Sequence, residues 1–431
     1  MFKHYVKVAI RQIKRSFLFS SINMLGFVLG MTAAFLIYLW IVDELTFEDF
    51  NKNGDYIYRV IREEQSAKGQ VPSTVTPLSE VFRKDFSKVE NATFIKYGGK
   101  YDIYAGDVGV EANYGYVDTT FFDVFSFPVV AGDPSLLKKD PQMVVLSEAI
   151  AEKLFGKTSA IGKEVTCKFN KKYYKVAAVL KVPRKSHIQF EVLASWDSYL
   201  WDEIKDELWG FSERMHVFIQ LKKGTSLTDA DRLAMRDLWV KHSQWGKPLA
   251  FQPLKDIHLR TAFKEPNDVY NHGNMQQIYL FAALAALIIF MGAFNFMTLS
   301  TARASQRSKE IGVRKVTGAK RKMLITQFLS ESLVQAFLSL VLALALTELL
   351  LPFFNRFVGK DIVLLFNWQT MLFILFGIIG VGSLAGAFPA FYMSSFNPLL
   401  AFKGGKATGR KGTLIKGLVC VQFVIAITML F

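Results

Sequence analysis

The chain has 431 residues, a formal net charge of +15 and a mean hydropathy of +0.23, so it is too long for one compact domain and too apolar in blocks for an ordinary soluble protein. Eighteen of its basic residues lie in three short segments, 3–15, 303–322 and 403–416, which border apolar runs. This placement is typical of membrane topology and argues against a nucleic-acid partner.

The N-terminal segment, residues 1–20, predicts an interfacial helix. Its apolar residues recur at helical spacing and its basic residues lie on the other face, so we expect it to lie along the inner membrane surface. Residues 21–42 follow as an apolar run that is long enough to cross a hydrocarbon core of about 30 Å. No small-residue cleavage site precedes Asp43 and Glu44, which predicts a retained first span.

Residues 43–277 predict an extracytoplasmic α+β domain. Residues 56–61, 143–146, 165–169, 173–180 and 216–221 have the composition of strands, and Asn170 with Lys171 suggests a hairpin turn. Helices are expected after Thr76, from Ser147 to a stop at Gly156, and over residues 228–242. The interleaved pattern favours an α+β fold, and it is compatible with one lobe or with two.

Three further spans are predicted at residues 278–301, 325–351 and 368–392. The loops 302–324 and 393–417 are rich in Lys and Arg, whereas the loop 352–367 is not. Because such residues resist translocation, we expect a multi-pass protein of the bacterial cytoplasmic (inner) membrane with its N-terminus inside. Residues 418–431 are expected to start a fifth, truncated span, which suggests a piece of a longer protein.

Catalysis and metal binding find little support in the sequence. The six histidines lack metal-ligand spacing, and Cys167 and Cys420 fall in different compartments, so neither a metal site nor a disulfide is expected. The acidic group at residues 43–49 is interpreted as a solvated collar next to the membrane. The sequence GKTSAIGKE at 156–164 departs from a phosphate loop in spacing and favours a helix cap and turn.

Two pairs of glycines within the spans predict close helix packing. Gly26 and Gly30 lie four residues apart in the first span, and Gly382 and Gly386 repeat this spacing in the fourth. Small residues at such spacing let two helix backbones approach one another. The same contacts could also form a moving interface, and the sequence alone does not separate these alternatives.

The segment from Ala302 to Lys322, ARASQRSKEIGVRKVTGAKRK, carries eight basic residues and one acid between two spans. It predicts a short cytoplasmic helix that stops at Gly318. By charge alone, a membrane anchor and a docking helix are equally good interpretations. Glu310, Ile311, Gly312 and Val313 favour docking, because a docking helix needs apolar residues to fill a pocket.

This segment resembles the signature of the FtsX/MacB-type ABC transporter permeases in RSKEIGVRKVTGAKRKMLITQFLSES, residues 307–332. RQIKRSFLFSSINMLGFVLGM and DELTFEDFNKNGDYIYRV are similar to the opening of these permeases, and VVLSEAIAEKLFGKTSAIGKEV to their periplasmic core domain. FPAFYMSSFNPLLAFKG is similar to the segment after the fourth span. The resemblance covers nearly the whole chain and suits the first half of a tandem-duplicated member.

The resemblance implies that a cytoplasmic ABC ATPase dimer, separate or fused, binds ATP and Mg and that this chain binds no cofactor and is not an enzyme. It also implies a coupling helix that transmits ATPase closure to the extracytoplasmic domain. The residues that would contact or shape the docking surface are Lys309, Glu310, Ile311, Gly312, Arg314, Lys315 and Gly318.

Membrane lipid is a further expected partner, and the resemblance leaves room for periplasmic or outer-membrane partners. An alternative function, a membrane-anchored sensor with an extracytoplasmic ligand-binding domain, stays open at this point. The identity of a copurifying cytoplasmic protein separates the two: an ATPase favours the permease, and a kinase or regulator favours the sensor.

Overall fold

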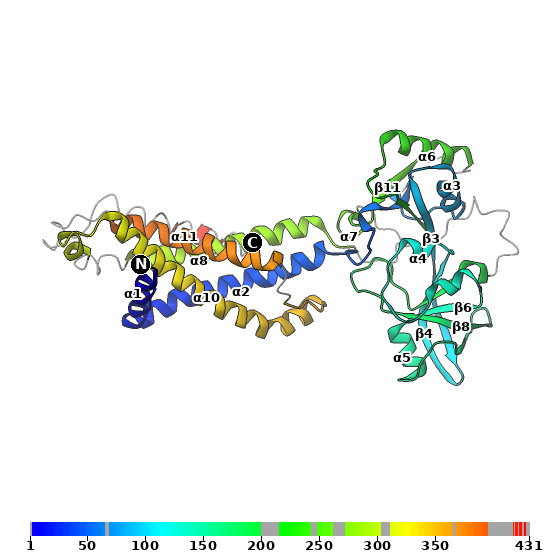
Figure 1. Ribbon diagram of the computed structural model, residues 1–431, viewed down its shortest axis with the longest axis horizontal. Helices are drawn as coiled ribbons and strands as arrows, with labels where there is room; N and C mark the ends of the chain where they lie inside the picture. The colour runs from blue at the N-terminus through cyan, green and yellow to red at the C-terminus, as the bar shows by residue number, and fades with distance from the viewer. Residues whose placement is uncertain are drawn as a thin grey trace. The chain divides into compact units, whose positions relative to one another are not determined.

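The computed structural model describes residues 2–64, 69–199, 215–242, 248–261, 272–302, 311–364, 368–394 and eight residues between 417 and 427. The chain divides into two compact units (Figure 1). Residues 1–43 and 276–431 form one, called the membrane unit, and residues 44–275 form the other, called the inserted domain.

The membrane unit is helical. Its described helices are α1 (Phe2–Arg15), α2 (Phe17–Leu45), α8 (Met275–Ala302), α10 (Arg321–Val358) and α11 (Trp368–Ser394). The last four are long and apolar enough to cross a membrane, and each contains one predicted span. α10 continues through Pro352, so the loop expected at 352–367 begins only after Val358, where Gly359 adopts φ 67° and ends the helix.

A fifth span is not shown. Residues 417, 419–420, 422–424 and 426–427 are helical, but the residues between and after them lie outside the described part of the chain. The predicted cytoplasmic segment at 393–417 also lies almost entirely outside it.

The spanning helices pack around an apolar core. Phe27 and Phe35 of α2 meet Phe296 of α8, Leu340 of α10 and Ala385 of α11, all buried. The rings of Phe27 and Phe296 stack with their centroids 5.2 Å apart. Large apolar side chains on the outer faces are exposed, as expected for helices whose remaining surface meets lipid.

The inserted domain is built on an eleven-stranded, mostly antiparallel sheet whose central order is β11-β1-β10-β3-β4-β9-β6-β8-β5. β4 and β9 pair in parallel, as do β6 and β8. The strands are β1 (Ile57–Glu64), β2 (Gly69–Val71), β3 (Val89–Ala105), β4 (Val108–Val117), β5 (Val129–Gly132), β6 (Met143–Ser147), β7 (Glu164–Cys167), β8 (Lys172–Leu180), β9 (Val192–Ser195), β10 (Met215–Leu221) and β11 (Leu249–Pro253).

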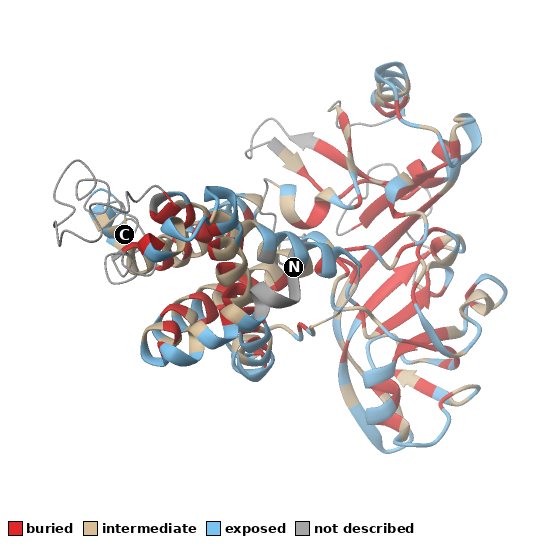
Figure 2. Cartoon of the chain, turned by 60° about the vertical axis from the view of Figure 1, so that its left-hand side comes forward, coloured by how far each residue is buried: buried red, intermediate tan, exposed pale blue. Residues whose placement is uncertain are grey.

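One long strand joins the two halves of this domain. The 17-residue β3 pairs with β10 through its first half and with β4 and β7 through its second. Helices α3 (Pro77–Asp85) and α6 (Asp229–His242) contribute to a core around Trp239, and α5 (Glu148–Phe155) contributes to another around Tyr116. In Figure 2 many of the buried residues, drawn in red, lie along the strands of this sheet.

Local signals in the sequence account for several of these elements. Ser147 caps α5 by accepting a hydrogen bond from the Ile150 amide, and Gly156 ends that helix with φ 61°. Pro77 opens α3 as predicted. The turn at Asn170 and Lys171 joins β7 to β8, with Lys171 at φ 56° and the Lys172 amide donating to Asn170 Oδ1.

Asp118 makes the stability of the inserted domain depend on pH. Burial raises the pKa of this carboxyl to about 6, although hydrogen bonds from Thr93 and Thr120 oppose the shift. The folded pKa lies above the unfolded one, so protonation favours the fold, and this contribution is lost as pH rises through about 6. Between pH 7 and 5 we expect Asp118→Asn to reduce the gain of stability on acidification, as measured by thermal unfolding at a series of pH values. An unchanged pH profile would contradict this assignment.

Candidate functional site

The segment between α8 and α10, residues 302–322, is called the coupling segment. Its described part contains a short helix over residues 311–316. Gly318 adopts φ 96°, and the Ala319 amide donates to the Arg314 carbonyl at 2.9 Å, so the helix ends where the glycine predicted. Lys309 and Glu310 lie outside the described residues.

Ile311 fixes this helix to the membrane unit. It is 3% exposed and packs with Leu324 and Phe328 of α10 and with Ala390 and Met393 of α11. Gly312 beside it is also buried. Ile311 and Gly312 therefore position the helix against α10 and α11. Because both are buried, contacts with a partner protein would be made by the exposed residues beside them.

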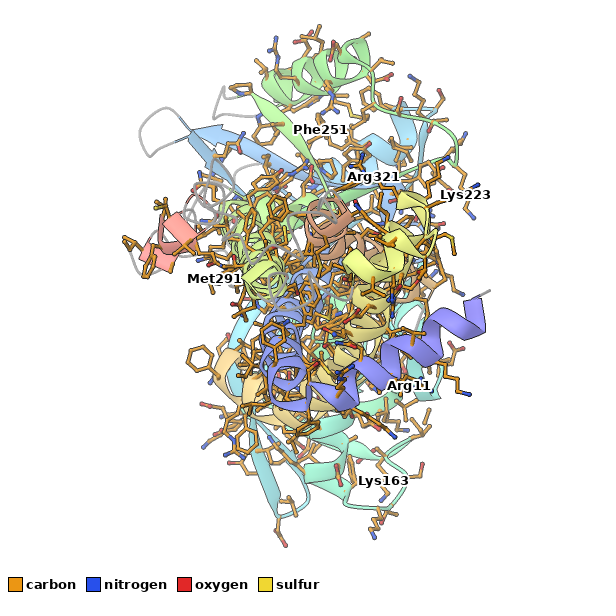
Figure 3. The ribbon with its side chains drawn as sticks, turned by 90° about the vertical axis from the view of Figure 1, so that its left-hand side faces the viewer. Arg11, Lys163, Lys223, Phe251, Met291 and Arg321 are labelled. Carbon is orange, nitrogen blue, oxygen red and sulfur yellow. The ribbon has the colours of Figure 1, made fainter. Side chains whose placement is uncertain are left out.

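Basic side chains of the coupling segment bind the ends of the spans. Arg314 Nη1 donates to Gln327 Oε1 at 2.6 Å, and Lys315 Nζ donates to the Ser394 carbonyl at 2.7 Å. Ser394 is the last residue of α11, where unpaired carbonyls favour a cation. Arg321, whose place on α10 is visible in Figure 3, donates from Nε to Ser394 Oγ at 3.3 Å. Burial, and to a smaller extent the charge of Arg321, lowers the pKa of Lys315.

The opposite face of the same helix is open. Val313 is 50% exposed and Val316 is 71% exposed, and Thr317 and Lys320 beside them are exposed as well. An apolar pair with a polar rim is the composition of a protein-docking surface. The sequence pattern pointed to Val313 but not to Val316 or Ser394, because the roles of these two residues depend on how the helix is rotated against α10 and α11.

The predicted glycine pairs lie where helices approach closely. A Cβ at Gly386 would stand 2.7 Å from Ser332 Cβ and Oγ on α10, and one at Gly382 would stand 2.8 Å from Leu333 Cδ2. A Cβ at Gly26 would stand 3.0 Å from Asn295 Nδ2 on α8, and one at Gly30 would make only ordinary contact with Ile288. The α10–α11 interface therefore has the least room for a side chain.

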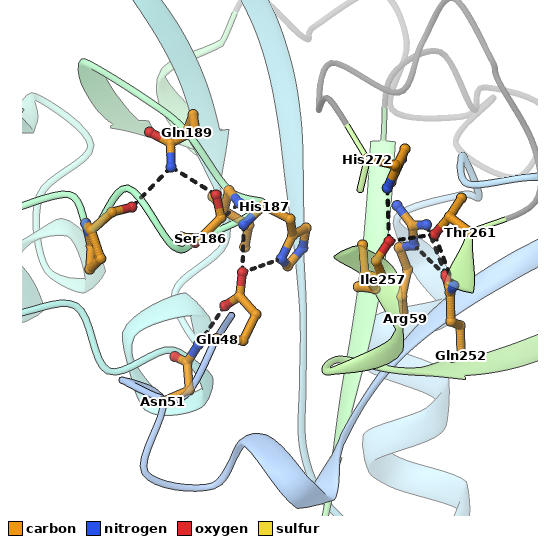
Figure 4. Close-up of polar contacts among 12 residues, drawn as sticks. Glu48, Asn51, Arg59, Ser186, His187, Gln189, Gln252, Ile257, Thr261 and His272 are labelled. Carbon is orange, nitrogen blue, oxygen red and sulfur yellow. Dashed lines mark hydrogen bonds and ion pairs between the residues drawn. The ribbon is translucent and has the colours of Figure 1, made fainter. Parts of the chain in front are cut away.

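The residues of the inserted domain that directly follow α2 belong to a buried carboxylate network. Glu48 is 1% exposed; its Oε1 accepts from the His187 backbone amide and lies 2.9 Å from His187 Nδ1. Its Oε2 accepts from Asn51 Nδ2 at 2.8 Å (Figure 4). Asn51 Oδ1 accepts from the Ser126 amide. Glu48 therefore ties the segment that follows α2 to the loop before β9.

A second buried pair, of a carboxylate and a histidine, involves the residue at which the inserted domain begins. Glu44 is hydrogen-bonded to His258 of α7 (Asp256–Arg260), whose ring stacks on Phe47 with centroids 3.7 Å apart. A Cβ at Gly273 would stand 2.9 Å from Glu44 Oε2 and from His258 Nε2. Glu44, where the chain enters the inserted domain, and Gly273, where it leaves, therefore both lie against His258.

The prediction that the acidic residues at 43–49 form a solvated collar is therefore wrong for Glu44 and Glu48, which are buried and paired with histidines. Their histidine partners are 214 and 139 residues away in sequence. No spacing rule relates residues so far apart in a single sequence, so the sequence contained no signal for these two pairs. Asp49 does behave as a surface residue, with its carboxylate 3.1 Å from Lys255 Nζ.

Polar contacts continue next to this network. Arg59 of β1 donates from Nη2 to Gln252 Oε1 at 2.9 Å, Gln252 Nε2 donates to Thr261 Oγ1, and His272 Nδ1 lies 2.8 Å from the Ile257 carbonyl (Figure 4). Among the described residues, no group of three or more His, Cys, Asp or Glu side chains is placed to hold a metal ion. Both cysteines are free thiols.

These features define a class of protein: a multi-pass membrane protein with an α+β domain inserted between its first and second spans. Family models match both parts. The MacB-like periplasmic core domain matches residues 20–235, and the FtsX-like permease C-terminal region matches residues 282–398. The chain belongs to the FtsX/MacB-type ABC transporter permeases, which places it in the inner membrane.

Curated relatives include the macrolide export ATP-binding/permease protein MacB of Neisseria gonorrhoeae, 22% identical over 286 residues, or 66% of this chain and 42% of that protein. The protein of the same name from Campylobacter jejuni is 24% identical over 233 residues, or 54% of this chain and 34% of its own. The chain therefore spans less than half the length of these relatives.

Solved structures include a domain of a putative permease from Porphyromonas gingivalis, with a TM-score of 0.42, 16% identity, and coverage of 54% of this chain and 99% of that one. The periplasmic region of MacB from Actinobacillus actinomycetemcomitans gives a TM-score of 0.36 with 15% identity, and covers 47% of this chain and 91% of its own.

Proposed function

We propose that this chain is a permease subunit that transmits movement from a cytoplasmic ABC ATPase dimer to the inserted domain on the other side of the membrane. Family membership supports the permease role. The observation that carries the transmission step is the two-sided coupling helix, which is fixed to α10 and α11 through Ile311 and Lys315 and presents Val313 and Val316 outward. A helix held this way moves together with the spans that it contacts.

ATP and Mg are proposed to bind to the partner ATPase, and this chain is proposed to hold no cofactor. The segment 156–164 supports this assignment through its geometry. A phosphate loop opens a helix with its glycines, whereas Gly156 ends α5 and Gly162, at φ 76°, leads into β7.

The proposed orientation places the N-terminus and the coupling segment in the cytoplasm. The excess of Lys and Arg in residues 1–20 and 302–324 supports it, since such residues are retained on the inner side. Helix α1, on which Figure 3 marks Arg11, is proposed to lie on membrane lipid. The inserted domain would then be open to periplasmic or outer-membrane proteins.

A charge placed on the open face of the coupling helix tests the docking proposal. We expect Val316→Asp to reduce the amount of ATPase that copurifies with the full chain at least tenfold, because a buried carboxylate disfavours an apolar contact. Val363→Asp is the matched control: this valine is 60% exposed and lies in the connection between α10 and α11, away from the coupling segment. Equal ATPase recovery with both variants would refute the docking surface.

A further inference from the structure

The membrane unit contains a small polar cavity at the end of the bundle next to the coupling segment. Its volume is about 40 Å³, and side chains from α1, α2, α8, α10 and α11 line it. The polar part of the lining includes Ser16, Ser20, Asn23, Glu331, Ser332 and Gln335. A polar cavity of this kind is unusual inside an otherwise apolar helix bundle.

Two amide side chains in the lining are buried, and the oxygen of each is without a hydrogen-bond donor among the described residues. Asn23 is 2% exposed and Gln335 is 5% exposed. Within the described part of the chain, neither Asn23 Oδ1 nor Gln335 Oε1 accepts a hydrogen bond. Unsatisfied polar oxygens in a low-dielectric interior are unfavourable, so both atoms require a donor that the described protein does not supply.

Water can supply the missing donors and fits the volume of the cavity. One water molecule donates two hydrogens, and a cavity of this volume has room for about two or three. Hydroxyl groups beside the amides complete its surroundings: Ser16 Oγ and Ser20 Oγ are 3.5 Å apart, and Ser332 Oγ donates to the Phe328 carbonyl, which leaves its lone pairs to accept. We propose that the cavity is a resident water site that bridges Asn23 of α2 to Gln335 of α10.

The place of the site gives it a mechanical consequence. Phe328 and Met393 line the cavity and also pack against Ile311, so the water lies next to the anchor of the coupling helix. Elsewhere α2 and α10 bond directly, with Thr32 Oγ1 donating to the Ala343 carbonyl at 3.3 Å. A water bridge re-forms after a small displacement of either helix, whereas a direct bond of fixed length breaks.

A double-mutant cycle on the full chain in detergent tests the site. Asn23→Leu, Gln335→Leu and the double variant are compared by equilibrium unfolding. If water bridges the two amides, the change in the unfolding equilibrium constant for the double variant differs from the product of the single changes by about fivefold or more. Thr298→Val is the control partner: its hydroxyl donates to the Phe294 carbonyl of its own helix, so its effect should combine with that of Asn23→Leu without coupling.

A high-resolution structure of the wild-type protein gives a second readout that does not depend on whether the variants fold. The proposal predicts density within about 2.7–3.2 Å of both amide oxygens. An empty cavity, or single effects that combine without coupling, would overturn it. The wild-type protein is also compared in sodium chloride and in choline chloride at equal ionic strength. Greater stability in sodium chloride that both leucine variants abolish would overturn the proposal as well, because the occupant would then be a cation.

Discussion

Replacing Glu48 by alanine is expected to destabilise the inserted domain by about 3–5 kcal/mol, the cost typical of removing one partner from a buried ionic or hydrogen-bonded pair. The carboxylate accepts from the His187 amide and from Asn51, and it lies against the His187 ring, so its loss leaves several buried groups unsatisfied. Glu48 has φ 65°, a conformation that alanine tolerates no better, so the backbone strain is the same in both proteins. Thermal or denaturant unfolding of the purified full chain measures the effect.

The neighbouring Asp49 provides the matched control for this prediction. Its side chain is 47% exposed and pairs with Lys255, which is itself 43% exposed. Asp49→Ala should therefore cost less than about 1 kcal/mol, as exposed ion pairs do. Glu48→Gln, which keeps the shape and one acceptor, should fall between the two alanine variants. Equal stability of Glu48→Ala and Asp49→Ala would contradict the buried network.

The second large effect is expected at the contact between α10 and α11. Gly386→Ala puts a methyl group 2.7 Å from Ser332 Cβ and Oγ, closer than real Cβ atoms approach, so the two helices must separate or shift. Overpacking of this kind costs about 1–3 kcal/mol. We expect a lower unfolding temperature in detergent and weaker burial of the α10–α11 interface, measured by hydrogen exchange.

Gly380 lies on the same helix and has open space where a Cβ would stand. Gly380→Ala should leave stability unchanged or raise it by roughly 0.5–1 kcal/mol, because alanine favours a helix over glycine. The comparison isolates the packing contact from helix propensity. Similar losses in both variants would mean that the fourth span does not depend on close approach at Gly386.

Elements governed by local sequence could be predicted. The four spanning helices follow from unbroken apolar runs, and α5 follows from Ser147 and Gly156, whose cap and stop are visible within ten residues. The hairpin at Lys171 likewise follows from its turn residues. In each case the determining interactions lie close together in the chain, so one sequence contains the full signal.

Interactions between distant parts of the chain could not be predicted. The long β3 was missed because it pairs with β10 at one end and with β4 and β7 at the other, so no single alternating pattern marks it. Glu44 and Glu48 looked like surface acids because their histidines are far away in sequence. Lys315 was expected to contact or shape the docking surface, and its hydrogen bond to Ser394 at the end of α11 could not be predicted because the two residues lie 79 positions apart.

Hydrogen exchange of the permease–ATPase complex is the sharpest test of transmission from the coupling segment to the first residues of the inserted domain. The complex is compared in the ADP state and in an ATP state held by a hydrolysis-deficient ATPase. If movement is transmitted, exchange changes both at residues 311–318 and at residues 44–51, which contain Glu44 and Glu48. A change confined to the coupling segment, with residues 44–51 unaffected, would contradict it.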